Sequence, residues 1–94
     1  MAMILLHCQR KKRMPTWSVY MVRCGDGSLY TGITVDVEKR VALHNDGKGA
    51  KYTRARMPVV LVWSAEMMTA TDARKAEVDL KRLSKKEKEE LIGV

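Results

Sequence analysis

Two strand-like segments joined by a glycine-rich turn constrain the fold of this chain more than any other feature of its sequence. Residues 17–24 alternate with the two-residue period of a half-buried β-strand, and residues 29–33 read Leu-Tyr-Thr-Gly-Ile, which suits a second strand. Between them, residues 25–27 read Gly-Asp-Gly, which are residue types typical of a tight turn. The sequence therefore predicts a β-hairpin.

The length of the turn decides which residues of the hairpin face each other. A three-residue loop with Gly27 in the left-handed conformation forms a type I turn followed by a bulge. In the resulting register Val22 lies opposite Tyr30. Tyr20 then lies opposite Gly32, and both tyrosines are on one face of the sheet. A two-residue loop would put the tyrosines on opposite faces, so the register is a prediction with chemical consequences.

Downstream of the hairpin, the residue pattern predicts a helix, a loop and a third strand. Asp36 can cap a helix that continues to about Asp46, where Gly47 is available as the C-terminal stop. Residues 47–57 are polar and are expected to form a loop. The run Val-Val-Leu-Val-Trp at residues 59–63 follows a proline and predicts the third strand.

Two capping sequences predict two further helices. The first should begin near Thr69 or Thr71, where Thr-Ala-Thr-Asp has the form of a capping box, and should continue to about Leu83. A second capping box begins at Ser84 and predicts a short helix through Leu91. The order of elements is therefore β-β-α-β-α-α, which predicts a fold of the α/β class, in its α+β form.

The chain of 94 residues has room for a single compact domain, which we place at residues 16–94. Residues 1–15 have no convincing periodicity, and we interpret them as an N-terminal extension that is either disordered or added. The apolar stretch at residues 1–6 is too short to span a membrane, and positive charge follows it instead of preceding it as in a secretory signal. Cys8 and Cys24 lack metal-ligand spacing, which excludes a cysteine-rich zinc site and favours a reduced, cytoplasmic protein.

The net charge of the chain points to a polyanionic partner. It is +7 at pH 7, which favours DNA, RNA or an anionic membrane surface as the partner. Basic residues concentrate in the run at residues 10–13 and in residues 38–56, which hold six Lys or Arg against one Glu and one Asp. The alternative is that these charges serve solubility alone.

One carboxylate lies inside the apolar stripe of the helix expected to begin near Thr69. Glu77 falls within the stripe that is formed by Ala73, Ala76, Leu80 and Leu83. A carboxylate on the inner face of a helix normally pairs with a cation or coordinates a metal ion. Glu77 is therefore a metal ligand, an ion-pair partner of Arg40, or a residue at the margin of the core.

Four other side chains are also either structural residues or members of a site. Arg40 and His44 are four residues apart, so they lie on one face of their helix, one turn from each other. They form either an ordinary surface pair or part of a site. Tyr20 and Tyr30 are likewise either packing residues with satisfied hydroxyls or site residues.

In their order along the chain these residues resemble the signature of the GIY-YIG nuclease family, from about Trp17 to Leu91. Ser-Val-Tyr ends at Tyr20, and Tyr-Thr-Gly begins at Tyr30 after nine intervening residues; Arg40 with His44 and then Glu77 follow. The first triplet departs from Gly-Ile-Tyr at its first two positions, and the second departs from Tyr-Ile-Gly at its middle position. Both tyrosines and the second glycine remain.

The resemblance implies a three-stranded antiparallel sheet flanked by helices. It also implies hydrolysis of phosphodiester bonds with one divalent cation, usually Mg²⁺ and alternatively Mn²⁺. Tyr20 would be the general base or its hydrogen-bonded relay, and Tyr30 the second tyrosine of the site. Arg40 would steady the phosphate and His44 would assist proton transfer or positioning. Glu77 would be the metal ligand.

Two physical requirements follow from those roles. A free tyrosine has a pKa near ~10 and is a poor base at neutral pH, so Tyr20 needs Arg40, the metal ion or a relay that lowers its pKa. A lone carboxylate is a sparse site for a hard cation. We therefore expect the ion to keep several waters and to bind fully only when substrate phosphate adds ligands.

The segment Gly-Lys-Gly-Ala-Lys-Tyr-Thr-Arg at residues 47–54 looks like a loop of the small stand-alone bacterial members of that family and of structure-specific relatives. It lacks the spacing of a nucleotide-binding P-loop and the strand that precedes one, which argues against nucleotide hydrolysis. Either it is a solvated loop, or its side chains contact phosphates or stack on a base. The candidate nucleic-acid-binding residues are Lys39, Lys48, Lys51, Tyr52, Arg54 and Arg56.

The sequence therefore favours a metal-dependent endonuclease that acts on nucleic acid, with DNA preferred over RNA. Structured or damaged DNA in repair or recombination is the expected substrate, and a protein partner is one source of specificity. The alternative is a nucleic-acid-binding module with little or no activity without a partner.

Overall fold

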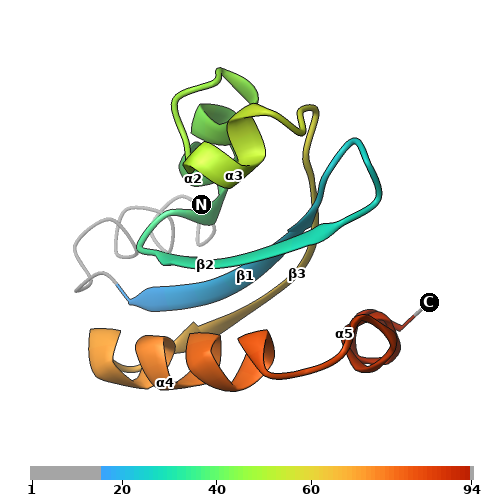
Figure 1. Ribbon diagram of the computed structural model, residues 1–94. Coiled ribbons are helices and arrows are strands. Elements are labelled where there is room, and N and C mark those ends of the chain that lie inside the picture. The colour runs from blue at the N-terminus through green and yellow to red at the C-terminus, as the bar shows by residue number, and fades with distance from the viewer. Residues whose placement is uncertain (1–15, 94) are drawn as a thin grey trace, which may run out of the picture.

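The computed structural model describes residues 16–93, which form three strands and four helices around one sheet (Figure 1). The predicted extension at residues 1–15 lies outside the described residues. The strand and helix order β-β-α-β-α-α is confirmed, with one additional short helix. In chain order the elements are β1 (Trp17–Arg23), β2 (Leu29–Thr34), α2 (Val37–Asn45), α3 (Lys51–Arg54), β3 (Val60–Met67), α4 (Ala70–Lys81) and α5 (Lys85–Ile92).

The three strands form an antiparallel sheet in the order β2-β1-β3, as the family resemblance implied. The register of the hairpin is that of the three-residue loop: Val22 lies opposite Tyr30, and Tyr20 lies opposite Gly32. Gly27 has a φ of 86°, which is the left-handed conformation that this loop requires. Both tyrosines therefore lie on one face of the sheet.

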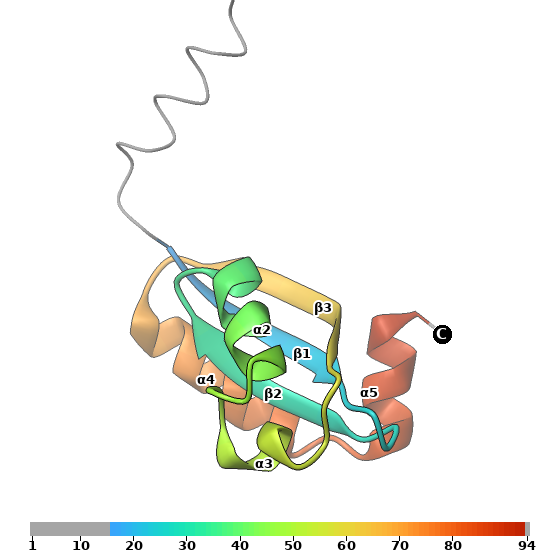
Figure 2. The same ribbon diagram turned by 90° about the horizontal axis from the view of Figure 1, so that it is seen from above.

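Helices cover both faces of the sheet. Figures 1 and 2 show α2 and α3 on one side and α4 on the other, with α5 beyond the end of α4. Tyr20 and Val22 pack toward α2, where Val37 and Val41 are partly buried against them. Because side chains alternate along a strand, Val19 and Met21 point to the opposite face, and both are fully buried.

The ends of α2 follow the sequence signals, but the expected loop at residues 47–57 is not a loop throughout. Asp36 caps α2 by accepting a hydrogen bond from the Lys39 amide at 3.1 Å, and Gly47 follows the helix with a φ of 76°. The short helix α3 then forms inside the segment. Its first carbonyl, that of Ala50, accepts from the backbone of Thr53 and Arg54 without any side-chain cap, so no capping signal marks it.

The remaining elements differ from expectation only at their ends. β3 begins at Val60 and continues to Met67, beyond the expected end at residue 63, because it pairs with β1 along its whole length. Thr69 caps α4, which ends at Lys81 and not at residue 83. The capping box of α5 is present at Ser84. Among the helices of residues 16–93, none combines the length and apolar character needed to cross a membrane.

Candidate active site

Tyr20 is the buried centre of the site. Its side chain is 1% exposed and lies across Gly32 on the neighbouring edge strand β2. A Cβ atom at residue 32 would stand 2.7 Å from the Tyr20 hydroxyl oxygen, so only glycine leaves the hydroxyl in its place. Gly32, the glycine of the second triplet, therefore leaves the space that the side chain of Tyr20, the tyrosine of the first triplet, occupies.

The hydroxyl of Tyr20 meets His44 from helix α2. The distance from Tyr20 Oη to His44 Nε2 is 2.8 Å, and the second ring nitrogen, Nδ1, lies 2.7 Å from the hydroxyl of Thr53 in α3. His44 and Thr53 are both 0% exposed. Any Cβ atom at Gly49 would collide with the imidazole ring, so the backbone of the loop also closes over His44. His44 is thus a buried member of the site and not one half of a surface pair.

Burial and neighbouring charges control the protonation of both groups. Burial raises the pKa of Tyr20, and the nearby Tyr30 and Glu77 raise it further, while the Arg40 guanidinium opposes them. Burial also lowers the pKa of His44, and Arg40 lowers it further. At neutral pH the site therefore holds a neutral phenol against a neutral imidazole. Of the three groups that could lower the pKa of Tyr20, Arg40 acts in that direction, but burial outweighs it.

Glu77 reaches the same site from the opposite face of the sheet. It lies on α4, which packs beneath β2, and its carboxylate is near enough to Tyr20 to raise the pKa of that hydroxyl. Its side chain is 23% exposed and pairs with Lys81 at 3.2 Å, so among the described residues the ion-pair partner is Lys81 and not Arg40. Arg40, partly buried on α2, completes the set of groups around the Tyr20 hydroxyl.

The donor set suits a weakly held, hydrated cation. Within residues 16–93 no group of three His, Cys, Asp or Glu side chains is close enough to enclose a metal ion. Glu77 supplies one partly exposed carboxylate. Such a ligand fits Mg²⁺, which keeps several waters and takes further oxygens from a substrate phosphate.

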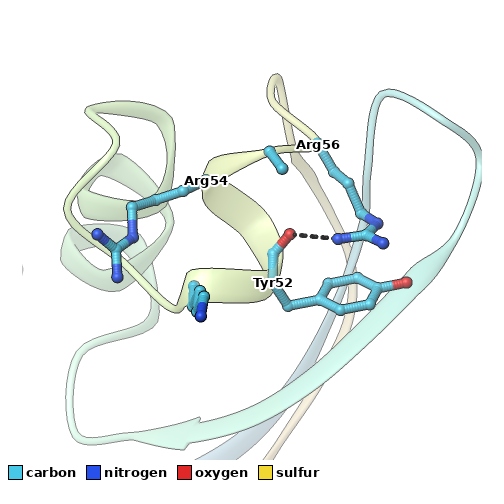
Figure 3. Close-up of a pocket in the computed structure, with 5 residues that line it drawn as sticks. Tyr52, Arg54 and Arg56 are labelled. Atoms are coloured by element: carbon cyan, nitrogen blue, oxygen red, sulfur yellow. Dashed lines mark hydrogen bonds between the residues drawn. The ribbon is translucent and has the colours of Figure 1, made fainter.

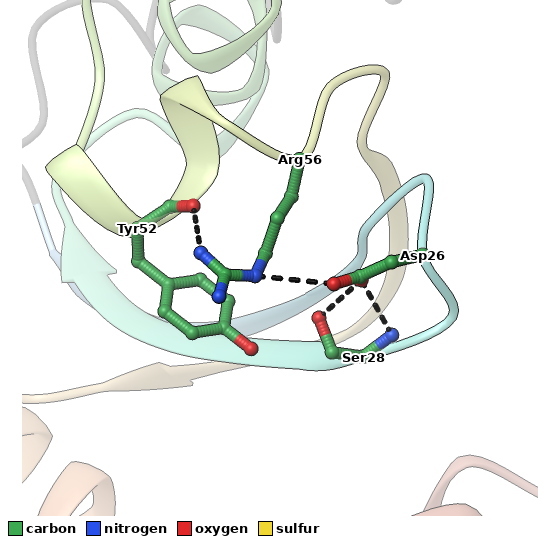
Figure 4. A network of polar contacts seen from close by, with 4 residues as sticks. All are labelled: Asp26, Ser28, Tyr52 and Arg56. Carbon is green, nitrogen blue, oxygen red and sulfur yellow. Dashed lines mark hydrogen bonds and ion pairs between the residues drawn. The ribbon is translucent and has the colours of Figure 1, made fainter.

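A stack of aromatic and cationic side chains extends from His44 along the surface. The ring of Tyr30 meets His44 edge-on at 5.5 Å between centroids and lies 5.8 Å from the ring of Tyr52, inclined by 24°. The guanidinium of Arg56 lies 3.9 Å from the centroid of Tyr52. Arg56 also donates to the Tyr52 carbonyl at 3.0 Å and pairs with Asp26 at 3.1 Å, which ties α3 to the hairpin turn (Figure 4).

The predicted nucleic-acid-binding residues divide into two groups. Four of them line an open pocket of about 640 Å³ that carries no acidic side chain (Figure 3): Lys51, Tyr52, Arg54 and Arg56. Lys39 and Lys48 are exposed but lie outside it. Among these cations, Arg56 already pairs with Asp26, which balances its charge.

Three residues of this region were missed by the sequence analysis. Thr53 contacts His44, Gly49 makes room for it, and Asp26 holds Arg56. Gly49 and Asp26 carried only signals of flexibility and turn formation. A buried threonine among exposed basic residues has no periodicity that would reveal it, since α3 is a single turn of helix.

Known proteins resemble this chain across the whole site. A family profile described as the GIY-YIG catalytic domain matches residues 16–90. A UPF0213 protein of Bacillus licheniformis is 53% identical over 73 residues, which cover 78% of this chain and 75% of that protein. A UPF0213 protein of Staphylococcus saprophyticus is 49% identical over 75 residues, covering 80% of this chain and 92% of that protein.

Two solved structures are similar to the chain as well. The solution NMR structure of the UPF0213 protein BH0048 from Bacillus halodurans is 44% identical, covers 82% of each chain and has a TM-score of 0.54. The solution NMR structure of the protein EF2693 from E. faecalis is 38% identical, covers 85% of each chain and has a TM-score of 0.58. The region matched by the family profile contains every residue of the candidate site.

Proposed function

Because the chain belongs to the GIY-YIG family, whose catalytic domain implies nuclease activity, we propose that it is an endonuclease that hydrolyses phosphodiester bonds of DNA with one divalent cation, Mg²⁺ or Mn²⁺. The observation that carries this proposal is the buried hydrogen bond between Tyr20 and His44, with Arg40 beside the same hydroxyl and Glu77 near enough to influence its pKa. A neutral acid–base pair next to a cation and a carboxylate is what water activation at a phosphate needs.

The tyrosine and the histidine act as a unit in the proposed reaction. The raised pKa of Tyr20 argues against a deprotonated Tyr20 in the free enzyme. A neutral phenol can still take a proton from the attacking water if it passes its own proton to His44 at the same time. The hydroxide that results attacks phosphorus, the bond to the leaving oxygen breaks, and the leaving oxygen takes a proton from solvent.

Arg40 and Glu77 supply the electrostatic part. The Arg40 guanidinium, beside Tyr20, is placed to stabilise negative charge on the non-bridging oxygens of the phosphate. Glu77 would hold the cation, which stabilises charge on the phosphate and its leaving oxygen when it is bound. The ion pair between Glu77 and Lys81 must open for this, and its partly exposed geometry makes that exchange inexpensive.

The pocket lined by Lys51, Tyr52, Arg54 and Arg56 supports DNA as the partner. Its cations suit contacts with the phosphate backbone, which position a strand without reading its sequence. We propose that branched or damaged DNA is the preferred substrate, with a role in repair or recombination, because an open surface of this kind accommodates a strand that leaves the duplex axis. An intracellular location and a protein partner that adds specificity belong to the same proposal.

The test is cleavage of a labelled panel of single-stranded, duplex, flapped and four-way-junction DNA, together with RNA, in Mg²⁺, Mn²⁺ or EDTA. Glu77→Gln removes the charge of the proposed metal ligand and keeps its shape, and Glu90→Gln, on an exposed position of α5, is the matched control. We expect metal-dependent cleavage that is lost in Glu77→Gln and kept in Glu90→Gln.

The outcome also separates the proposal from its alternative. Salt-dependent binding that is equal in all three proteins, with no cleavage under any condition, would identify a nucleic-acid-binding module instead. Cleavage of RNA alone would correct the substrate and leave the chemistry in place.

A further inference from the structure

The buried chain of hydrogen bonds behind Tyr20 continues past His44 to a residue with no assigned role. Thr53 Oγ1 lies 2.7 Å from His44 Nδ1 and 2.9 Å from the carbonyl oxygen of Ala50. We propose that the Thr53 hydroxyl is a positioning group, which holds His44 in the tautomer that carries its hydrogen on Nδ1 and thereby sets the direction of proton movement from Tyr20 to His44. The effect of Thr53 on proton transfer rests on the proposed function, but the tautomer of His44 does not.

The hydrogen of the Thr53 hydroxyl points at a backbone carbonyl and not at His44. A hydroxyl has a single hydrogen, and a carbonyl oxygen can only accept, so the 2.9 Å contact with Ala50 requires that hydrogen to point at the carbonyl. If the hydrogen pointed at His44 instead, two oxygen atoms would face each other at 2.9 Å with no hydrogen between them. Thr53 therefore accepts from His44, and Nδ1 must carry a hydrogen.

The hydroxyl of Tyr20, on the other side of the imidazole ring, independently requires the same tautomer. Tyr20 is 1% exposed, so its phenolic hydrogen needs an acceptor within the protein. The adjacent guanidinium of Arg40 has only donors and cannot serve. The acceptor at hand is His44 Nε2, 2.8 Å away, which must then lack a hydrogen. The contacts at both ring nitrogens therefore place the hydrogen of a neutral imidazole on Nδ1.

Packing keeps this arrangement in place. Thr53 and His44 are both 0% exposed, and the backbone at Gly49 lies against the ring, so no water can take over the position of the Thr53 hydroxyl. The one-turn helix α3 thus brings Thr53 into contact with His44. Its residue Thr53 supplies a hydroxyl whose hydrogen already points at the backbone carbonyl of Ala50, the residue that precedes the helix.

The consequence concerns the proposed proton transfer. With a bare Nε2 facing the phenol, the bond from Tyr20 Oη to its hydrogen can break while a bond from that hydrogen to His44 Nε2 forms. In the same step Tyr20 Oη takes a hydrogen from the attacking water. The imidazolium that results keeps its Nδ1 hydrogen bonded to Thr53 Oγ1, which stabilises the charge. In the opposite tautomer Nε2 already carries a hydrogen, and the transfer cannot begin.

The experiment reads the tautomer directly in the full chain. Long-range ¹H–¹⁵N spectra of ¹⁵N-labelled histidine distinguish a protonated from an unprotonated ring nitrogen, and a His7→Gln background leaves His44 as the source of signal. We expect His44 to carry its hydrogen on Nδ1 in the parent protein and in Thr53→Ser. In Thr53→Val the population with hydrogen on Nε2 should rise, because a buried N–H would then face a methyl group.

Thr31→Val is the matched control, since Thr31 is 3% exposed and its hydroxyl has no hydrogen-bond partner in the described part of the chain. It should leave the His44 signals unchanged. On a cleaved substrate, Thr53→Val should lower kcat by at least about tenfold with KM unchanged, and Thr53→Ser should restore it. Thr53→Ala, which removes the same hydroxyl without adding a methyl group, serves if Thr53→Val does not fold.

Two results would overturn the inference: hydrogen on Nε2 in the parent protein, or an unchanged tautomer in a folded variant that lacks the Thr53 hydroxyl. Either can be obtained whether or not the protein cuts any substrate. If the tautomer is as expected but no nucleic acid is cleaved, the proposed function fails and the positioning role of Thr53 stands. If cleavage occurs with hydrogen on Nε2, the proposed function stands and the positioning role of Thr53 fails.

Discussion

Replacing Gly32 by alanine tests whether the position of the Tyr20 hydroxyl governs the proposed reaction. The added Cβ would stand 2.7 Å from Tyr20 Oη and 2.9 Å from Cζ, whereas ordinary contacts begin at 3.4 Å. The hydroxyl must therefore move by about 0.7 Å. A displacement of that size along the 2.8 Å hydrogen bond to His44 would stretch it to the limit at which it stops acting as one.

The expected cost has two parts. Misplacement by about 1 Å in a reacting group can lower a rate by about 100-fold, so kcat of Gly32→Ala should fall by about 10- to 100-fold. Forcing a methyl group into a packed site costs about 1–3 kcal/mol of folding stability. Single-turnover cleavage at saturating enzyme measures the first effect, and urea unfolding measures the second.

Gly27→Ala is the control because it costs stability without touching the site. Gly27 has a φ of 86° and no heavy atom within 4 Å of an added Cβ, so alanine there pays about 1–2 kcal/mol for the left-handed conformation alone. We expect it to retain the parent kcat. If Gly32→Ala also retained the parent kcat, the link between the place of the Tyr20 hydroxyl and catalysis would be wrong.

Three further predictions concern stability. The pKa of His44 lies below its ordinary value of 6.5 in the folded protein, so the unfolded chain binds more protons below that pH. The free energy of unfolding should therefore fall as the pH is lowered from about 7 to about 5, and His44→Gln should make this pH dependence weaker in urea titrations. An equal pH dependence in the parent protein and in His44→Gln would contradict the lowered pKa of His44. Asn45 exchanges two hydrogen bonds with the backbone of Val59, at 2.7 and 3.0 Å, so Asn45→Ala should cost about 2–3 kcal/mol in the same assay. Thr31→Val should raise stability by about 1 kcal/mol, because it removes a buried hydroxyl that has no partner in residues 16–93; a loss of more than about 1 kcal/mol would mean that the hydroxyl is satisfied.

Much of the fold could be predicted because its signals are local. The turn that ends in Gly27 determines the hairpin register, and Asp36 and Thr69 begin their helices through hydrogen bonds to amides three residues on. The expected end of β3 was wrong for the opposite reason. A strand continues as long as a neighbouring strand forms hydrogen bonds with it. The end of β3 therefore depends on the length of β1, which the residues of β3 do not reveal.

The members of the candidate site could also be named from the sequence, since Tyr20, Tyr30, Arg40, His44 and Glu77 keep a recognisable order along the chain. Their arrangement could not. Glu77 and Arg40 come from helices on opposite faces of the sheet, and both influence the pKa of the Tyr20 hydroxyl, which lies over Gly32 on the edge strand β2.

The sequence by itself thus determined the order of the elements, the shared face of the two tyrosines and the identity of the candidate site residues. Only the tertiary structure decided that Tyr20 has a raised pKa, that Asp26 balances Arg56 and that Thr53 reaches His44. Turns and helix caps depend on residues within a few positions of one another. Burial, charge balance and hydrogen-bond polarity depend on segments that are distant in sequence, and they exist only after β1, α2 and α3 have packed together.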